Sequence, residues 1–391
     1  MKTLEIAMYY PWIHLKGGIE RSIAALVSRS RHNWTIFTSH YEPSDTFEEF
    51  ARFKVIQIGD VSVSRDMGSV LKAAARIATL RIPVDKFDVF AVWCDGLGPL
   101  TTFRNATIPS ICICSTPLRP VYDPVYARDA LNRRSGLARL AFRAFRSSFR
   151  FVDRLAWKRF DGVIATSLEV KERIVRNGLF ADGPAMTLNH PGIAVADAPS
   201  DVSYKDYFLV PGRITWTKNI ELAIDSFLRA DLPPPWRLVI AGFVDQKSTR
   251  YLEELKLRAG SSGRVEFVCN PSDEQLNGLY GNAFAVLFPP LNEDWGVAPL
   301  EGMLRSKAIV ANRSGGPKES VENGVSGWLL EPTVEDWAPL LRSLPDRREL
   351  VLRFGRQARV LVEKYDWGHF VRGVETMVEK LAGGKELRSE S

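Results

Sequence analysis

The fold of this chain is decided by the stretch NEDWGVAPLEGM, residues 292–303. It follows an apolar run, Phe284–Phe288, that reads as a buried parallel strand and ends at two prolines. Pro299 suits the first turn of a following helix, because its missing N–H has no partner to lose there. The stretch therefore predicts Glu293 on a loop at the carboxyl end of a strand and Glu301 one turn into a helix. Ligands bind at this edge of an open α/β sheet, although a glutamate in a first helical turn is also a common dipole partner.

Strand-like apolar runs alternate with helical periodicity along the whole chain. The runs of the first half lie at 4–10, 34–38, 54–58, 87–94, 110–115 and 162–166. Those of the second half lie at 208–210, 237–242, 264–269, 284–288, 308–311 and 328–330. Between the halves, residues 194–203 lose the pattern and are typical of a linker. The alternation predicts an α/β chain with two doubly wound parallel sheets, each covered by helices on both faces.

Length and composition favour a globular protein of two domains. The chain has 391 residues, of which 45% are hydrophobic and 25% charged. No apolar run approaches the roughly 20 residues that span a bilayer, and residues 1–10 read as a strand rather than a secretory signal. We therefore expect a cytoplasmic protein.

The four cysteines, at 94, 112, 114 and 269, are expected to be reduced. Cys112 and Cys114 alternate with isoleucines in a strand-like run, so we expect both on one face as small core residues. A metal site would need Cys or His partners at short spacing, and none lies nearby in the sequence. We therefore expect no metal site.

Two glycine-rich turns follow, Gly315-Gly316-Pro317-Lys318-Glu319 and Gly324-Val325-Ser326-Gly327. Together with residues 292–303, this string resembles the nucleotide-sugar half of the family 4 retaining glycosyltransferases, which have the GT-B fold. Departures from the family pattern, such as Trp295 for Phe and Gly302 for Ala, fall at packing positions. The resemblance implies two Rossmann-like domains facing a central cleft. Residues 1–197, with a returning helix at 367–391, would form the acceptor side, and residues 203–366 the nucleotide-sugar side.

A second matching element is PGRITWTKN, residues 211–219, which ends the first strand of the second half. Cations there suit the negative charge that develops on a departing nucleoside diphosphate, although surface cations are usually just solvated. By the resemblance, Arg213, Lys218 and Glu293 are the catalytic set, with Glu293 on the hydroxyls of the donor sugar. The other implied donor-binding residues are Gly17, Gly18, Gly212, Gly242, Val268, Asn270, Gly296, Val297, Ala298 and, on the ribose, Glu301.

The acceptor side carries a weaker signal. The stretch Ser115-Thr116-Pro117-Leu118-Arg119 resembles the His-Thr-Pro-x-Arg element of a mannosyltransferase-like branch of the family, with Ser115 in place of the usual histidine. A serine can still hydrogen-bond a sugar, but it cannot hold a positive charge near the reaction. The resemblance implies that Ser115, Arg119 and Asp123 contact the sugar or the acceptor.

The resemblance implies a retaining hexosyltransferase, which we expect to be independent of a metal ion and to need no cofactor. The chain has no Asp-x-Asp sequence, the spacing that commonly holds a diphosphate through a divalent ion. Branch resemblance favours GDP-mannose as the donor, with UDP-sugars second, and a glycan, lipid-linked or small-molecule acceptor. Two alternatives stay open. One is a nucleotide-sugar 2-epimerase of the same fold, and the other is a degenerate sugar-nucleotide binder without catalysis.

A basic amphipathic stretch at 128–159 indicates a second kind of partner. It interleaves apolar residues with many cations and only two carboxylates, Asp129 and Asp153. Such a helix can lie on an anionic membrane surface, which predicts peripheral contact with the inner face of the membrane. The alternative is a solvated face on a helix packed against the core. No nucleic-acid motif accompanies the stretch, so we expect no nucleic acid.

Overall fold

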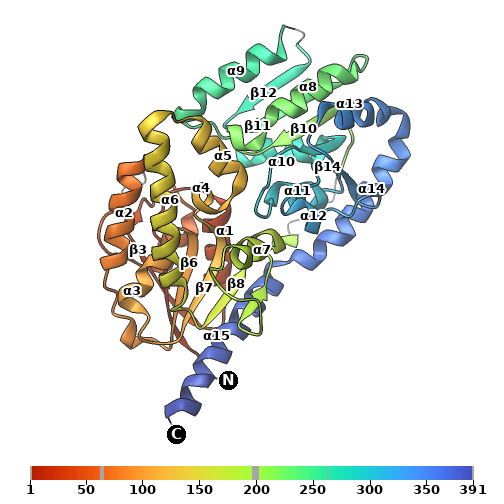
Figure 1. Ribbon diagram of the computed structural model, residues 1–391. Coiled ribbons are helices and arrows are strands. Elements are labelled where there is room, and N and C mark those ends of the chain that lie inside the picture. Colours follow the sequence, from red (N-terminus) through yellow and green to blue (C-terminus); the bar gives the residue numbers. More distant parts are fainter. Residues whose placement is uncertain (1, 62–65, 196–201, 262, 390–391) are drawn as a thin grey trace. The chain divides into compact units, whose positions relative to one another are not determined.

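The computed structural model describes residues 2–61, 66–195, 202–261 and 263–389, with side chains up to Gly384. The chain divides into two compact units, one formed by Met1–Gly192 with Trp367–Ser391 and the other by Ile193–Asp366. Residues 196–201 of the predicted linker lie outside the described residues. Each unit is a parallel sheet with helices packed on it, which confirms the predicted doubly wound α/β fold (Figure 1).

The first unit is built on a seven-stranded sheet in the order β5-β3-β1-β6-β7-β8-β9, with every pair parallel. Its strands are β1 (Glu5–Tyr9), β3 (Asn33–Thr38), β5 (Lys54–Gln57), β6 (Val89–Gly96), β7 (Ser110–Pro117), β8 (Gly162–Ala165) and β9 (Met186–Leu188), and β2 (Trp12–Ile13) pairs separately with β4 (His40–Tyr41). Its helices are α1 (Gly18–Arg29), α2 (Met67–Thr79), α3 (Thr102–Asn105), α4 (Arg119–Tyr122), α5 (Pro124–Asn132), α6 (Gly136–Trp157), α7 (Leu168–Arg176) and α15 (Trp367–Ser389).

Helix α15 returns from the end of the chain to pack on the first unit. The Phe370 ring lies 6.1 Å from that of Trp93 in β6, and the Asn189 side-chain amide donates to the Phe370 carbonyl at 2.8 Å. The Glu375 carboxylate accepts from the Arg31 backbone N–H at 2.8 Å. These contacts make α15 an integral layer of the first unit.

The second unit has a six-stranded parallel sheet in the order β12-β11-β10-β13-β14-β15. Its strands are β10 (Tyr207–Pro211), β11 (Arg237–Gly242), β12 (Val265–Cys269), β13 (Ala285–Phe288), β14 (Ala308–Asn312) and β15 (Gly327–Leu330). Its helices are α8 (Ile220–Ala230), α9 (Thr249–Ala259), α10 (Asp273–Asn282), α11 (Val297–Leu304), α12 (Pro317–Ser320), α13 (Val334–Ser343) and α14 (Arg348–Leu361).

The β10 sequence shows why helices cover both faces of this sheet. Successive residues of a strand point to opposite faces, so Phe208 and Val210 enter one apolar cluster while Tyr207 and Leu209 enter the other. All four are buried, which is the pattern of a strand in the middle of a parallel sheet.

The strand order also indicates which edge of the second sheet is the candidate ligand site. From β10 the chain builds β11 and β12 on one side, and then crosses to place β13 on the other side of β10. The loops after β10 and β13 therefore leave in opposite directions at the carboxyl ends of the strands, the edge at which open α/β sheets generally bind ligands.

The two predicted core cysteines have a third cysteine beside them, and the expectation of no metal site stays a prediction. Cys112 and Cys114 of β7 are buried core residues, as predicted, but Cys94 of the neighbouring strand β6 lies beside them. The three sulfur atoms lie within 4.8 Å of one another, with a geometry that could hold a metal ion. Sequence spacing missed this group because β6 and β7 are neighbours in the sheet while Cys94 lies far from the other two along the chain.

Candidate donor-binding site

The loops after β10 and β13 bring Lys218 and Glu293 together. The Lys218 Nζ lies 2.7 Å from the Glu293 Oε2, and the two side chains keep 17% and 21% of their surface exposed. A ligand can therefore reach both groups, although each is held by the other. The Phe288 ring, whose centroid lies 5.7 Å from the Lys218 Nζ, forms an apolar wall beside the ammonium group.

Local backbone geometry positions the loop after β10. Gly212 has a φ of +125°, a backbone conformation that residues other than glycine rarely adopt. A Cβ on Gly242, at the end of β11, would collide with the Gly212 carbonyl, so the close approach of the two strand ends requires glycine at position 242. The Asn219 side-chain amide donates to the Pro289 carbonyl at 3.1 Å and ties this loop to the end of β13.

The loop that carries Glu293 rests on Gly315 and Gly316. A Cβ on Gly315 would collide with the backbone of Glu293, and one on Gly316 with the carbonyl of Trp295. The Gly316 N–H donates to the Glu293 carbonyl at 2.8 Å. Sequence reasoning recognised the two glycines as a turn but missed this positioning role. The sequence did carry a signal for this role, because adjacent glycines in a loop can allow another backbone segment to pack closely against them.

Helix α11 begins beside Glu293 and carries Glu301. Gly296 precedes its first residue with a φ of +87°, and the first N–H groups of a helix lack intrahelical partners. Val297 and Ala298, the first two residues of the helix, are only partly buried. The Tyr280 hydroxyl, from α10, donates to the Glu301 Oε2 at 2.7 Å. Tyr280 was not among the predicted site residues, because its place in α10 gives no sequence signal of this bond.

Three of the remaining donor-side predictions fall at the same edge of the sheet. Asn270 has a φ of +51°, its N–H donates to the Gly242 carbonyl at 2.9 Å, and its side chain accepts from the Val244 N–H at 2.9 Å. Val268 is partly exposed near the end of β12. Arg213, on the loop after β10, is exposed and pairs with no carboxylate of the described residues.

Gly17 and Gly18 belong to the first unit and begin α1. Gly17 precedes the helix and its carbonyl accepts from the Arg21 N–H at 3.0 Å. The buried carboxylate of Glu20 lies so close that a Cβ on Gly17 would meet it. The start of α1 therefore faces an acidic side chain of its own first turn, and the contact of both glycines with a diphosphate remains a prediction.

The predicted acceptor residues are held by other side chains of the first unit. The Trp93 indole N–H donates to the Ser115 Oγ at 2.9 Å. Arg119 pairs with the buried Asp123 at 2.8 Å, and Asp123 also accepts the Val125 N–H at 2.8 Å as the N-cap of α5. The Arg173 guanidinium lies 3.3 Å from the same Asp123 carboxylate. Arg119 and Asp123 thus have clear structural roles, and their contact with an acceptor remains a prediction.

Two Rossmann-like units, one of which carries a cation–carboxylate pair at its switch point, are the arrangement expected of a GT-B glycosyltransferase. The family model of the group 1 glycosyl transferases matches residues 199–377, which confirms the family resemblance of this part of the chain. The predicted fold, family and enzyme class are therefore confirmed.

Known proteins similar to this chain are mannosyltransferases and GT-B enzymes. The α-1,3/1,6-mannosyltransferase ALG2 of Dictyostelium discoideum is 30% identical over 200 residues, which are 47% of this chain and 48% of that protein. ALG2 of Rhizomucor pusillus is 26% identical over the whole chain and 94% of its own length. The structure of Anabaena Alr3699/HepE with UDP and glucose superposes with a TM-score of 0.73 at 17% identity, over 97% of this chain and all of the other. The ALG2 relatives confirm the resemblance to a mannosyltransferase-like branch and do not favour the epimerase, and the HepE structure confirms the fold.

Proposed function

We propose that this glycosyltransferase moves mannose from GDP-mannose to a glycan or lipid-linked acceptor, with retention of configuration and without a metal ion. The mannosyltransferase relatives support the choice of sugar. The observation that carries the proposal is the Lys218–Glu293 pair at the carboxyl ends of β10 and β13.

The chemistry of the donor requires a cation beside a hydrogen-bond acceptor. Departure of the nucleoside diphosphate leaves negative charge on phosphate oxygens, and the Lys218 ammonium and Arg213 guanidinium on one loop can stabilise that charge. The Glu293 carboxylate accepts hydrogen bonds and suits the hydroxyls of the sugar. In this proposal Lys218 holds Glu293 in place before the donor binds.

The other end of the donor would lie toward α11. A carboxylate fixed by one hydrogen bond retains acceptor capacity for others, so Glu301, anchored by the Tyr280 hydroxyl, suits the two hydroxyls of a ribose. The nucleotide base is expected near the ends of β11 and β12. Gly242 and Asn270 lie there, and we expect the base to be contacted mainly by backbone groups.

The experiment that tests this proposal is a transfer assay with GDP-mannose and a panel of UDP- and dTDP-sugars, run with and without EDTA. We expect transfer from GDP-mannose that EDTA leaves unchanged, and a GDP-mannose-dependent rise in melting temperature. Transfer only from another donor would overturn the choice of mannose. Loss of activity in EDTA, restored by a divalent ion, would overturn metal independence. A thermal shift without transfer to any acceptor offered would support the degenerate binder instead.

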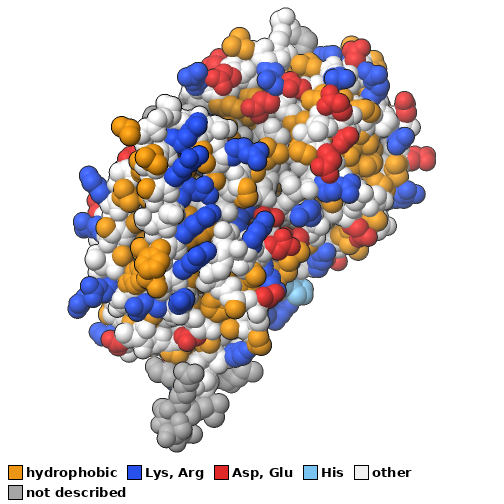
Figure 2. Space-filling view, viewed as in Figure 1, with side chains coloured by type: hydrophobic (Ala, Val, Ile, Leu, Met, Phe, Trp, Pro, Cys, Tyr) orange, Lys and Arg blue, Asp and Glu red, His pale blue; other side chains and the backbone are white. Residues whose placement is uncertain are grey.

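The proposal includes membrane contact through α6. Among the described residues, no helix combines the length and apolar content needed to cross a bilayer. Helix α6 nevertheless exposes Leu137, Leu140 and Phe151 to 84%, 63% and 68%, all on the side away from its buried residues. Figure 2 shows hydrophobic side chains beside a row of Lys and Arg over this helix. This arrangement supports a peripheral helix that lies in an anionic membrane surface.

A further inference from the structure

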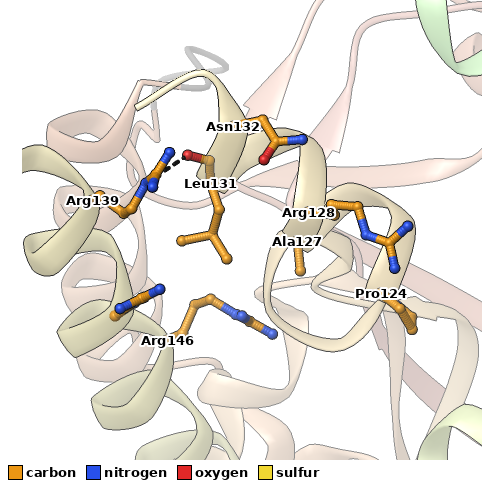
Figure 3. A pocket seen from close by; sticks show the side chains of 8 residues that line it. Pro124, Ala127, Arg128, Leu131, Asn132, Arg139 and Arg146 are labelled. Atoms are coloured by element: carbon orange, nitrogen blue, oxygen red, sulfur yellow. Dashed lines mark hydrogen bonds between the residues drawn. The ribbon is translucent and has the colours of Figure 1, made fainter. Parts of the chain in front are cut away.

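Between α5 and α6 the first unit has a concavity of about 400 Å³ that no carboxylate lines. Four of its lining side chains are arginines, Arg128 of α5 and Arg139, Arg143 and Arg146 of α6, and we call it the arginine cup. Figure 3 shows Arg146 reaching from α6 toward α5, with Leu131 pointing into the space between the helices and Arg128 on the outer side of α5.

The arginines of the cup lack counter-charges. The nearby carboxylates are already engaged, since Asp129 pairs with Arg133 at 2.8 Å and Asp123 with Arg119 at 2.8 Å. None of the four cup arginines forms an ion pair within the described part of the chain. Arg139 donates instead to the backbone carbonyls of Leu131 and Arg134, at 3.2 and 3.1 Å.

Arg146 is the most constrained member of the cup. Its guanidinium donates to the Val121 carbonyl at 3.0 Å, and the same carbonyl accepts from Arg150 at 3.0 Å. The Nε atoms of Arg146 and Arg150 are both buried without a hydrogen-bond partner among the described residues. Burial, reinforced by the positive charge of Arg150, lowers the pKa of Arg146. Gathering like charges beside unsatisfied donors costs free energy that an anion would recover.

We propose that the arginine cup binds the phosphate group of an anionic membrane lipid. Guanidinium groups match phosphate oxygens through paired N–H donors, which the ammonium of lysine does not provide. The exposed apolar residues Leu137, Leu140 and Phe151 lie on the same helix and would insert among the lipid tails. They therefore favour a lipid headgroup over a free phosphate as the ligand of the cup. The inference rests on the membrane contact proposed above.

The test is flotation of the full-length protein with vesicles of phosphatidylcholine alone or with phosphatidic acid added. The decisive variant is Arg139→Lys/Arg143→Lys/Arg146→Lys, which keeps every charge but removes the paired donors. We expect the wild type to float with phosphatidic acid and the lysine variant to lose at least tenfold in vesicle affinity. The corresponding alanine variant should lose roughly a hundredfold, because three cations near an anionic surface are removed. Melting temperatures show that each variant folds.

A matched control removes three exposed arginines from the second unit, Arg229→Ala/Arg250→Ala/Arg353→Ala, and should float like the wild type. If the lysine variant floats as well as the wild type, the phosphate cup is overturned while membrane contact stands. If the wild type binds neither kind of vesicle, both the proposed membrane contact and the proposed lipid ligand are overturned. If inorganic pyrophosphate binds the cup in calorimetry and no vesicle does, the ligand is a free phosphate and the lipid source is overturned.

Discussion

The donor loops of the second unit and the α5–α6 surface of the first unit both gather cations, but in different ways. Lys218 has a carboxylate partner, Glu293, at 2.7 Å, and the pair is held between two loops of the sheet. The arginine cup has four guanidinium groups and no carboxylate lining it. A paired cation is positioned for chemistry, whereas unpaired cations on a helix beside apolar side chains are available to an external anion. The difference is that Glu293 fixes Lys218 in one position, whereas no carboxylate of the described residues fixes the arginines of the cup.

The largest effect is expected from Lys218→Ala. The substitution removes the ammonium group that we assign to the leaving diphosphate and releases Glu293, so kcat/KM for the donor should fall by roughly 10²–10³-fold with the fold intact. Steady-state kinetics and a melting curve measure both. Lys256→Ala is the matched control, because it removes a lysine from an exposed ion pair with Glu253 and should keep full activity. Near-native kinetics of Lys218→Ala would contradict the role of Lys218 in stabilising the leaving diphosphate.

Gly316→Ala tests whether the pair depends on the loop beneath it. Gly316 has an ordinary helical φ of −56°, so the added Cβ acts only through its collision with the Trp295 carbonyl. We expect a loss of about 1–3 kcal/mol in unfolding free energy and reduced transfer, since the Glu293 loop must shift. The control is Gly281→Ala in α10, where a Cβ meets nothing within 4 Å. Equal stability and activity of the two variants would contradict the positioning role.

Tyr280→Phe sharpens the donor side of the comparison. Without the hydroxyl, Glu301 loses a hydrogen bond of 2.7 Å, and the KM for the donor should rise about fivefold to tenfold, equivalent to about 1 kcal/mol. Tyr251→Phe removes a similar bond of 2.6 Å, to Glu221, elsewhere in the same unit, and should leave KM unchanged. If both variants change KM alike, the effect comes from stability and not from the ribose contact.

Lys307 is a third kind of cation, which is fully buried and has no carboxylate partner among the residues that the structure describes. Its ammonium donates to the Ser203 carbonyl and lies 3.8 Å from the centroid of the Tyr204 ring, and burial lowers its pKa to about 7. The unfolded chain keeps this proton up to about pH 10, so its contribution to stability rises as the pH increases from about 7 to 10.

We expect Lys307→Met to remove that rise. Its melting temperature relative to the wild type should be highest near pH 7 and should fall by a few degrees toward pH 9. Lys256→Met, at an exposed position, is the control and should follow the wild type. Parallel curves for Lys307→Met and the wild type would show that Lys307 titrates normally.

Much of the fold and the core of the site could be predicted from local sequence. The run Phe284–Phe288 and the turn residues after it indicate a strand, a loop and a helix, and the structure has them at β13 and α11. The position of Lys218 and Glu293 at one edge of the sheet could be predicted because each follows a strand, whereas their catalytic role comes from the family resemblance and stays a prediction. Cys94 and Tyr280 could not be predicted, because their contacts are made across the sheet or between helices, where no local period records them.

The arginine cup also could not be predicted from the sequence, although the helix that carries most of it could. The basic and apolar residues of 128–159 predict an amphipathic helix, and α6 is one. Which arginines lack a carboxylate depends on the pairing of Asp123 and Asp129 with other side chains, and on the packing of α5 beside α6. Those pairings are tertiary contacts, so the sequence pattern marks the helix but not the concavity.

The return of α15 has a consequence for how the chain can be cut and rejoined. Ile193 bridges Asp366, and its N–H donates to the Tyr365 carbonyl at 2.7 Å, so the second unit starts and finishes at adjacent points. It is an insert with neighbouring ends, the arrangement that tolerates excision and circular permutation. A gene fragment for residues 193–366 should yield a self-contained module, while a short loop joining 192 to 367 should close the remaining half around its own terminal helix.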